Sequence, residues 1–419
     1  MAKGEQHRQQ RRILNPAFGP AQIRELTSIY VEKAHQLRDL WRDEILKRGL
    51  ESAQIDIFAG LTQAALDMIG LAGFHHEFGA LSSQNGDELI EAVHILSQLA
   101  SKLTANFLRF VKCYIPSLRF IPDPIERQAN VAQGIMRRIG TRLVAESKAT
   151  IANARKGEKG VRLDGRDLLT LLIKANMSLA AHQQLCDEDV IAQIVTFLVA
   201  GHDTTAHAVA WSLYALACAP QVQRKLREEL LHVRTENPSM DELNELPYLD
   251  AFVREVMRVH SPVPVALRQA DKADMIPLAH PVVDERGQVH DVVRIQEGQT
   301  IVIPIANINT SKDLWGEDAL EFKPERWLEN IPETIQQVPG AWANLMTFMG
   351  GPRACIGFRF ALAETKALLF SLVSAFEFEP STSHDAIFSV SSILERPYVQ
   401  GEEEKGPQLP LLLKPYQRS

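Results

Sequence analysis

The chain has 419 residues, of which 45% are apolar and 23% are charged, and its formal net charge is −7. This composition is typical of a globular protein that buries a core, and the negative net charge argues against a nucleic-acid partner. Length alone does not divide the chain, because large enzymes often keep one core of this size. We therefore expect a single domain over residues 1–419.

The four cysteines, which are Cys113, Cys186, Cys218 and Cys355, lie far apart and form no CxxC pair. We therefore expect a reducing compartment and no disulfide framework. No stretch reaches the roughly 18 uninterrupted apolar residues of a membrane span, and the first residues resemble neither a signal peptide nor an anchor. Taken alone, the sequence predicts a soluble chain.

Helical periodicity dominates the first part of the chain. The expected elements up to residue 176 are helices at 22–49, 55–70 and 164–176, a helical region at 87–154 and a charged surface loop at 155–160. The first two helices each end at a glycine of the kind that stops helices. A proline-rich break at 114–124 interrupts the helical region, and we interpret it as a mobile connection between two helices.

Residues 187–219 form the longest expected helix, with Asp187 as its N-cap and Pro220 after its end. The helix is apolar on nearly every face, so it should run through the middle of the fold. A polar patch at 200–205, with the sequence AGHDTT, interrupts this pattern. The threonines of such a patch commonly bond the preceding helical turn, but a buried Asp203 needs a partner or water.

The second half of the chain alternates between helices and short strands. The expected elements are helices at 220–235, 246–258 and 358–376, short β runs between 265 and 305, and closing strands at 375–380 and 408–413. Glu255 and Arg258 lie three residues apart in one of these helices. As an isolated pair they would contribute only about a few tenths of a kcal/mol.

Cys355 lies in a setting that favours a thiolate. Gly350, Gly351 and Gly357 surround it, Arg353 lies two residues before it, and an expected helix starts directly after it. Unpaired N–H groups and the positive end of a helix dipole lower the pKa of a cysteine, which favours the thiolate that a metal needs. A lone cysteine is a poor zinc or iron–sulfur site but could be the single axial thiolate of a haem. The plainer alternative is a buried structural cysteine.

The letters around this cysteine decide between these alternatives. Phe348, Gly351, Arg353, Cys355 and Gly357 form the pattern FxxGxRxCxG. This pattern resembles the haem-binding signature of the cytochrome P-450 haem-thiolate monooxygenases. At average residue usage, a chance match in a chain of this length is on the order of one in ten thousand.

Three further segments resemble motifs of the same family and occur in its order. The patch at 200–205 resembles the AGxDTT motif, Glu255 to Arg258 the ExxR motif, and 322–327 the PERF segment. The resemblance extends from about residue 7 to residue 415. It implies a cytochrome P-450 fold that is mainly α with a smaller β region (α+β). It also implies a haem b between the 187–219 helix and the Cys355 loop.

The resemblance assigns roles to residues on that helix. Asp203 and Thr204 would deliver protons to bound dioxygen, which is general acid chemistry. Ala200 and Gly201 would lie against the haem, with Gly201 making room for a small ligand. The Thr204 hydroxyl would compete for a carbonyl near Ala200 and open the helix locally.

The resemblance also assigns residues around the haem edge and the cysteine loop. His7, Arg11, Arg268 and Arg353 would neutralise the two haem propionates, and Phe348 would pack beside the sulfur. The alternatives are a solvated helix face for the basic N-terminal run and an exposed strand arginine for Arg268. Glu255, Arg258 and Arg326 would form a buried cluster that locks the loop presenting Cys355.

The family resemblance further implies partners. No flavin, nicotinamide or ferredoxin fingerprint is present, so electrons would come from an NADPH-dependent flavoprotein reductase. The reductase would dock on the cysteine side, where Arg8, Arg11 and Arg12 could add positive charge. The substrates would be dioxygen and a small lipophilic molecule. The expected substrate contacts are Phe197, Ala200, residues 262–266 and the loops near Leu118 and Ile393.

The segment RDLLTLLIKAN at 166–176 and the AGHDTT patch look closest to the eukaryotic, fungal-like microsomal members of the family, which carry a longer N-terminal part with a membrane anchor. By resemblance we expect a location on the cytoplasmic side of the endoplasmic reticulum membrane, with membrane contact only through that part. One alternative is an inactive truncated product or incomplete gene model that carries the motifs without holding haem stably, because sheet edges would be unpaired. Another is a haem-thiolate isomerase or peroxygenase, which the Asp203 and Thr204 pair disfavours.

Overall fold

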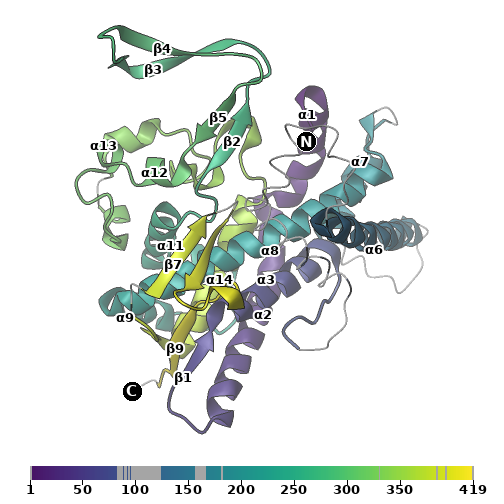
Figure 1. Ribbon diagram of the computed structural model, residues 1–419. Helices are drawn as coiled ribbons and strands as arrows, with labels where there is room; N and C mark the ends of the chain where they lie inside the picture. Colours follow the sequence, from purple (N-terminus) through teal and green to yellow (C-terminus); the bar gives the residue numbers. More distant parts are fainter. Residues whose placement is uncertain are drawn as a thin grey trace.

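The structure is a computed structural model (Figure 1). It describes residues 2–82, 88, 92, 95, 124–155, 167–180, 183–329, 331–383, 386–391 and 394–417. The expected proline-rich break at 114–124 lies almost entirely outside the described residues, as do Leu118, Ile393, Cys113 and most of the charged loop at 155–160.

Four long helices form the centre of the protein, and α8 runs through the middle of them (Figure 1). They are α2 (Pro20–Lys47), α3 (Ile57–Phe74), α8 (Asp187–Cys218) and α14 (Phe358–Ala375). Helix α3 packs along α8, and α14 packs along α2. Their buried apolar residues join in one continuous core, which stabilises this arrangement.

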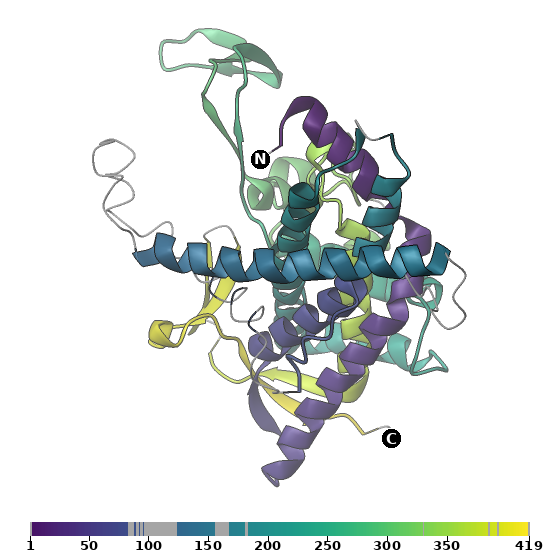
Figure 2. The ribbon, with the colours of Figure 1, turned by 90° about the vertical axis from the view of Figure 1, so that its right-hand side faces the viewer.

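Shorter helices surround this centre. They are α1 (Gly4–Leu14), α7 (Leu168–Met177), α9 (Pro220–Leu231), α10 (Met240–Asn244), α11 (Pro247–Val259), α12 (Ile305–Asn309) and α13 (Lys312–Trp315). The long helix α6 (Pro124–Arg155) crosses one side of the body, as Figure 2 shows. It packs against α7 and α8.

Helix α8 begins where the sequence predicts, although Cys186 and not Asp187 is the N-cap residue. The acidic side chains of Asp187, Glu188 and Asp189 lie in the first turn, where the helix dipole favours negative charge. The helix ends at Cys218, two residues before Pro220.

The predicted end of the helix at 55–70 is wrong. Residues 53–56 form the strand β1 (Ala53–Asp56), and α3 then continues through Gly70 to Phe74, where His75 adopts a left-handed conformation with φ of 51°. A Cβ atom at Gly70 would lie 2.3 Å from the ring of Phe78. This glycine therefore allows close packing within a helix and does not stop it.

The strands form small antiparallel sheets. In the largest described sheet, β9 (Pro410–Pro415) lies between β1 and β6 (Phe376–Pro380). The other pairs are β2 (Ala266–Gln269) with β5 (Thr300–Ile303), β3 (Asp274–Val283) with β4 (Val289–Ile295), and β7 (Ile387–Ser391) with β8 (Glu395–Val399). The β3–β4 hairpin projects away from the body (Figure 1). The expected mainly α fold with a smaller β region is confirmed.

Among the described helices, α3 is long and apolar enough to cross a membrane. However, 78% of its apolar window is buried inside the protein, where it packs against α8. The core helix of a soluble protein passes the same test, so α3 is weak evidence for a membrane span.

Candidate active site

Cys355 lies at the end of a tight loop that leads directly into α14. The Cys355 N–H donates to the Phe348 carbonyl at 2.8 Å, and the Ala354 N–H donates to the Gly351 carbonyl at 3.0 Å. Met349 and Gly351 have φ values of 58° and 68°, so the backbone turns through the left-handed region twice. The loop therefore presents the Cys355 thiol at the N-terminus of α14, as the sequence predicts.

Gly350 shows why this loop needs glycine. A Cβ atom at Gly350 would lie 1.8 Å from the carbonyl oxygen of Pro339, a distance that no side chain can accommodate. Gly351 has open space around it but requires glycine for its positive φ. Gly357 is contacted by Phe18, whose ring would lie 3.8 Å from an added Cβ atom.

The pKa of Cys355 differs from the prediction. Burial raises it, and the Gly357 N–H that hydrogen-bonds the sulfur and the nearby Arg11 guanidinium lower it only in part. The prediction of a lowered pKa is therefore wrong for the polypeptide by itself, because removal from water outweighs the loop and the cation. Cys355 is nevertheless a free cysteine, and the residue as a whole is exposed although the surrounding protein desolvates its sulfur.

Aromatic side chains pack beneath the loop. Phe348 is buried, and its ring lies 5.8 Å from that of Trp342 and 6.0 Å from that of Phe358, measured between ring centroids. These ring contacts anchor the residue at which the loop begins.

Three of the four predicted propionate-binding residues lie together beside the loop. Arg11 donates to the Ala354 carbonyl at 3.0 Å, and Arg353 donates to the Ala2 carbonyl at 2.8 Å. Burial lowers the pKa of His7, and the neighbouring Arg353 and Arg11 lower it further. His7 is therefore neutral at pH 7 and able to donate one N–H, next to two permanent cations.

Arg268 is not joined to this group in the described part of the chain. It lies on β2, is half-buried, and donates to the Leu267 carbonyl at 2.8 Å. Its assignment to a propionate therefore remains a prediction.

The residues of the AGHDTT patch on α8 differ in exposure, since Ala200 is exposed and Asp203 is buried. The Thr204 hydroxyl donates to the Ala200 carbonyl at 2.7 Å, the hydrogen bond expected from the sequence. Ala192, Thr196 and Ala200 are exposed at intervals of four residues, which makes a stripe of small side chains along one face of this central helix. The expectation of apolar burial on nearly every face is therefore wrong for the N-terminal half of α8.

Gly201 has a different role from the one predicted. A Cβ atom there would lie 3.2 Å from the side chain of Ile69 on α3, so the glycine faces a packed helix. The missing side chain allows α3 to approach α8 and does not provide room for a ligand.

Phe18 lies between α8 and the end of the cysteine loop. Its ring packs edge-on against Phe197 of α8, with 5.3 Å between ring centroids, and it is the ring that an added Cβ atom at Gly357 would approach. Segments at residues 18, 197 and 357 thus lie side by side, which brings the end of the cysteine loop near α8 about one turn before Ala200.

Asp203 is buried and has a partner that the sequence did not indicate. Arg396 of β8 donates to its carboxylate at 2.8 Å, and His207 lies 3.4 Å from the other carboxylate oxygen. Burial is the main cause that lowers the pKa of His207, so this imidazole is neutral and Arg396 supplies the balancing charge. No local pattern marks Arg396, because it lies 193 residues from Asp203.

Glu255, Arg258 and Arg326 form the buried cluster that the sequence suggested. Glu255 and Arg258 are both 0% exposed, and two guanidinium nitrogens of Arg258 donate to the two carboxylate oxygens at 2.8 and 2.9 Å. Arg326 lies 3.4 Å from the same carboxylate, and Trp327 donates to it at 2.9 Å. Such a buried charge is held only because every partner is in place.

Asn309 connects this cluster to the cysteine loop, and sequence reasoning missed it. Its carbonyl accepts from Arg258 at 3.2 Å. Its side chain accepts from the Met346 N–H at 2.9 Å and donates to the Thr347 hydroxyl at 2.8 Å. Thr347 directly precedes Phe348, so the ion-pair cluster and the loop share one hydrogen-bond network.

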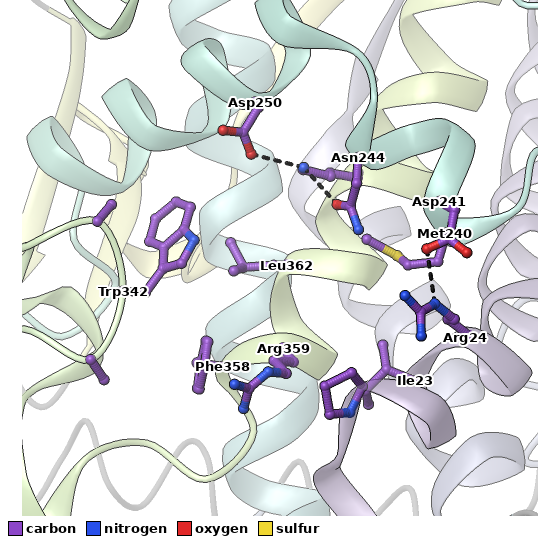
Figure 3. Close-up of a pocket in the computed structure, with 14 residues that line it drawn as sticks. Ile23, Arg24, Met240, Asp241, Asn244, Asp250, Trp342, Phe358, Arg359 and Leu362 are labelled. Carbon is purple, nitrogen blue, oxygen red and sulfur yellow. Dashed lines mark hydrogen bonds and ion pairs between the residues drawn. The ribbon is translucent and has the colours of Figure 1, made fainter.

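A hollow of about 480 Å³ lies beside the loop, next to Trp342 and Phe358 (Figure 3). On its far side Arg24 pairs with Asp241 at 2.8 Å. Arg359 is exposed, and its guanidinium lies 4.3 Å from the centre of the Phe358 ring. Two of the three arginines predicted to face the reductase are engaged within the protein. Arg8 pairs with Glu5, and Arg11 donates to the Ala354 carbonyl of the cysteine loop.

Comparison with known proteins identifies the family. A family model described as Cytochrome P450 matches residues 1–398. The chain belongs to the cytochrome P450 family. The cytochrome P450 monooxygenase 205 of Postia placenta is 56% identical over 420 residues, which cover 99% of this chain and 77% of the relative. Cytochrome P450 monooxygenase 128 of the same organism is 54% identical over 424 residues, with 100% and 77% covered.

A more distant relative has a more specific name. Ganoderic acid synthetase CYP5150L8 of Ganoderma lucidum is 34% identical over 399 residues, which cover 90% of this chain and 72% of the relative. The chain is thus a cytochrome P450 monooxygenase, and haem b is the cofactor of its family.

The residues present fit haem b. The free thiol of Cys355 suits the single protein ligand of a haem iron, and the exposed small side chains of α8 suit the face of a flat group. His7, Arg11 and Arg353 gather cationic and donor groups as two carboxylates require. In this P450, Cys355 would hold the iron, and these three residues would hold the propionates.

The buried cluster yields the first prediction. Replacing Glu255 with Gln leaves Arg258 buried without its countercharge, and we expect a loss of about 3–5 kcal/mol in the free energy of unfolding. Guanidinium denaturation followed by circular dichroism measures it. The matched control is Glu329→Gln, whose contact with Lys323 is at the surface, and it should change stability by about 0–1 kcal/mol. Equal effects of the two changes would contradict a structural role for the cluster.

Proposed function

We propose that this P450 inserts one atom of dioxygen into a small lipophilic substrate, with electrons from an NADPH-dependent flavoprotein reductase. The observation that carries the proposal is that Arg11 of α1 holds the Cys355 loop while Phe18 lies between the end of that loop and Phe197 of α8, the helix that carries Thr204. We also propose a location at the endoplasmic reticulum membrane, in keeping with the eukaryotic type that the sequence resembles.

Protein residues on two sides of the site would take part in this reaction, one side at the Cys355 loop and the other on α8. When bound, haem b would supply the iron for binding and activation of dioxygen, and Cys355 would hold that iron through its sulfur. On the cysteine face, the Gly357 N–H donates to the Cys355 sulfur, and Arg11 lies close enough to favour negative charge on it. On the other face, α8 provides the Thr204 hydroxyl and the Asp203 carboxylate.

Thr204 and Asp203 together can hold and move a proton. The Thr204 hydroxyl donates to Ala200, a bond that can be exchanged for one to a ligand on the exposed stripe of α8. The Asp203 carboxylate is occupied by the Arg396 guanidinium in this structure. The pair thus offers a hydroxyl that can donate and a carboxylate that can accept a proton, and a movement of Arg396 would free that carboxylate.

Exposed apolar side chains support an apolar substrate. Ala200 is exposed on α8 next to the buried Phe197, and Val265 is 41% exposed in the segment before β2. Apolar walls with few polar groups favour lipophilic ligands.

Replacement of Cys355 tests the cofactor side of the proposal. We expect purified protein to show the red-shifted Soret band of a thiolate-ligated ferrous carbon monoxide complex, and Cys355→Ala to lose it completely, because the sulfur is the axial ligand. The visible absorption spectrum measures this. A variant that keeps the red-shifted band would remove Cys355 from the iron and refute the proposal.

Replacement of Thr204 tests the proton side. Thr204→Ala removes the hydroxyl, so we expect the product formed per NADPH to fall about tenfold or more, with peroxide released in its place. NADPH, peroxide and product are measured together. Ser212→Ala is the matched control, because Ser212 makes the same bond to the preceding turn of α8, at 2.7 Å, in a fully buried position. Unchanged coupling in Thr204→Ala would exclude this hydroxyl from the proton route.

Replacement of Arg359, beside the hollow, tests where the reductase binds. Arg359 is an exposed cation close to the Cys355 loop, so Arg359→Glu should weaken docking of an acidic reductase and raise the reductase concentration needed for half-maximal turnover. We expect about a fivefold rise at low salt, which high salt removes. Arg286→Glu, at the tip of the projecting β3–β4 hairpin, is the control. Equal effects of both variants would place the docking surface elsewhere.

A further inference from the structure

A carboxyl group is buried in the core where nothing balances a charge. Glu364 of α14 is 0% exposed, and neither of its carboxylate oxygens has a hydrogen bond of normal geometry. An ionised carboxylate in such a place would be very unfavourable. Burial accordingly raises the pKa of Glu364 well above its ordinary value.

Two hydroxyl groups on other helices lie in the same part of the core. Tyr30 of α2 is also 0% exposed, and its hydroxyl has no hydrogen-bond partner in the described part of the chain. Its ring packs against Phe360, one helical turn before Glu364 on α14, with 5.1 Å between ring centroids. Glu364 contributes to the raised pKa of Tyr30, and the Thr205 hydroxyl of α8 lowers the pKa of Glu364 in part. Glu364 thus belongs to the helix α14 that packs against both α2 and α8.

The surrounding charged residues are engaged elsewhere. Lys366, on the same helix, binds Asp250 and Asn244, each at 2.9 Å. On α8, Asp203 pairs with Arg396. In the described part of the chain, no ion pair reaches Glu364.

The position of Glu364 links the two faces of the site. Its helix, α14, begins at Phe358, three residues after Cys355, and Thr205 is the neighbour of Thr204 on α8. The Thr205 hydroxyl donates to the Gly201 carbonyl at 3.2 Å, so it is tied to the same turn as the bond from Thr204 to Ala200.

We propose that Glu364 is a neutral carboxylic acid that positions the Thr204 turn of α8 relative to the helix carrying Cys355, an inference that rests on the proposed function. The donors and acceptors match only in this form. A neutral carboxyl has a proton that it can donate to the Thr205 oxygen and a carbonyl oxygen that can accept from the Tyr30 O–H, while the Thr205 O–H remains on Gly201. An ionised Glu364 would have no proton to give to Thr205, whose own proton is already used.

Glutamine preserves this pattern and leucine does not. In Glu364→Gln the amide N–H donates to Thr205 and the amide oxygen accepts from Tyr30, whereas Glu364→Leu keeps the volume and removes both bonds. Ser371→Ala is the matched control, because Ser371 is another buried polar side chain of α14 whose hydroxyl lacks a hydrogen bond.

Infrared spectroscopy of the purified holoprotein tests the neutral acid directly. We expect the wild type and Ser371→Ala to show the carbonyl stretching band of a protonated carboxylic acid that persists at pH 8, and Glu364→Gln to lack it. Absence of this band from the wild type, or its retention in Glu364→Gln, overturns the proposal. The readout requires no turnover.

The pH dependence of unfolding gives a second measurement. A carboxyl that is protonated in the folded protein loses its proton on unfolding above its ordinary pKa of 4.5, so the wild type loses stability as pH rises from there toward the raised pKa. Relative to Glu364→Gln, the unfolding equilibrium constant of the wild type should rise by about tenfold per pH unit in this window. Parallel curves for the two proteins would show that Glu364 is ionised and refute the neutral acid.

Coupling of NADPH use to product tests the positioning role. Glu364→Gln should couple as the wild type does, whereas Glu364→Leu should keep the red-shifted carbon monoxide band and release about fivefold more peroxide, the equivalent of one lost hydrogen bond at the Thr204 turn. Normal coupling in Glu364→Leu overturns the positioning role. Failure of the wild type itself to show the thiolate band would refute the proposed function, while the infrared band would still decide the state of Glu364.

Discussion

The negative charge of Glu255 lies where water does not reach it, and the cysteine side of the protein is built around that charge. Arg258 binds it through two nitrogens, and the same arginine donates to the backbone of Asn309. Asn309 in turn holds the segment that leads to Cys355. A buried charge is stable only with all its partners in place. The ion pair of Glu255 and Arg258 therefore helps to fix the position of the Cys355 thiol through Asn309, although neither residue hydrogen-bonds the thiol in the described part of the chain.

The opposite face of the site follows a different principle. On α8, Asp203 is balanced by a single cation, Arg396, which comes from a hairpin near the C-terminus. One ion pair is easier to open than a network, and Arg396 lies on a short two-stranded sheet. The cysteine loop is thus held by several linked contacts, whereas the buried carboxylate of α8 depends on one guanidinium.

Local sequence patterns predicted much of the fold. Apolar periodicity located α2, α8 and α14, and the motif spacing placed Cys355 at the start of α14, because these features depend on neighbours within a few turns. The end of α3 was predicted wrongly, since whether Gly70 stops a helix or admits a side chain depends on Phe78 folding back onto it.

Residues of the candidate site that belong to sequence motifs could be predicted. Residues that reach the site from distant parts of the chain could not. Asn309, Glu364 and Arg396 have no signature of their own, because their partners lie on other elements and become visible only in three dimensions. The direction in which Gly201 faces and the net effect of burial on Cys355 depend in the same way on what packs around them. Residue type and spacing do not contain that information.

The 1.8 Å between a hypothetical Cβ atom at Gly350 and the Pro339 oxygen has a consequence for protein engineering. A library that randomises the cysteine loop would lose nearly all members altered at this position before any selection for catalysis begins. Ile356 is only partly buried, so variation there can reach the thiol environment while the backbone stays intact. Attempts to evolve new reactivity in this scaffold should therefore hold the glycine constant and search around it.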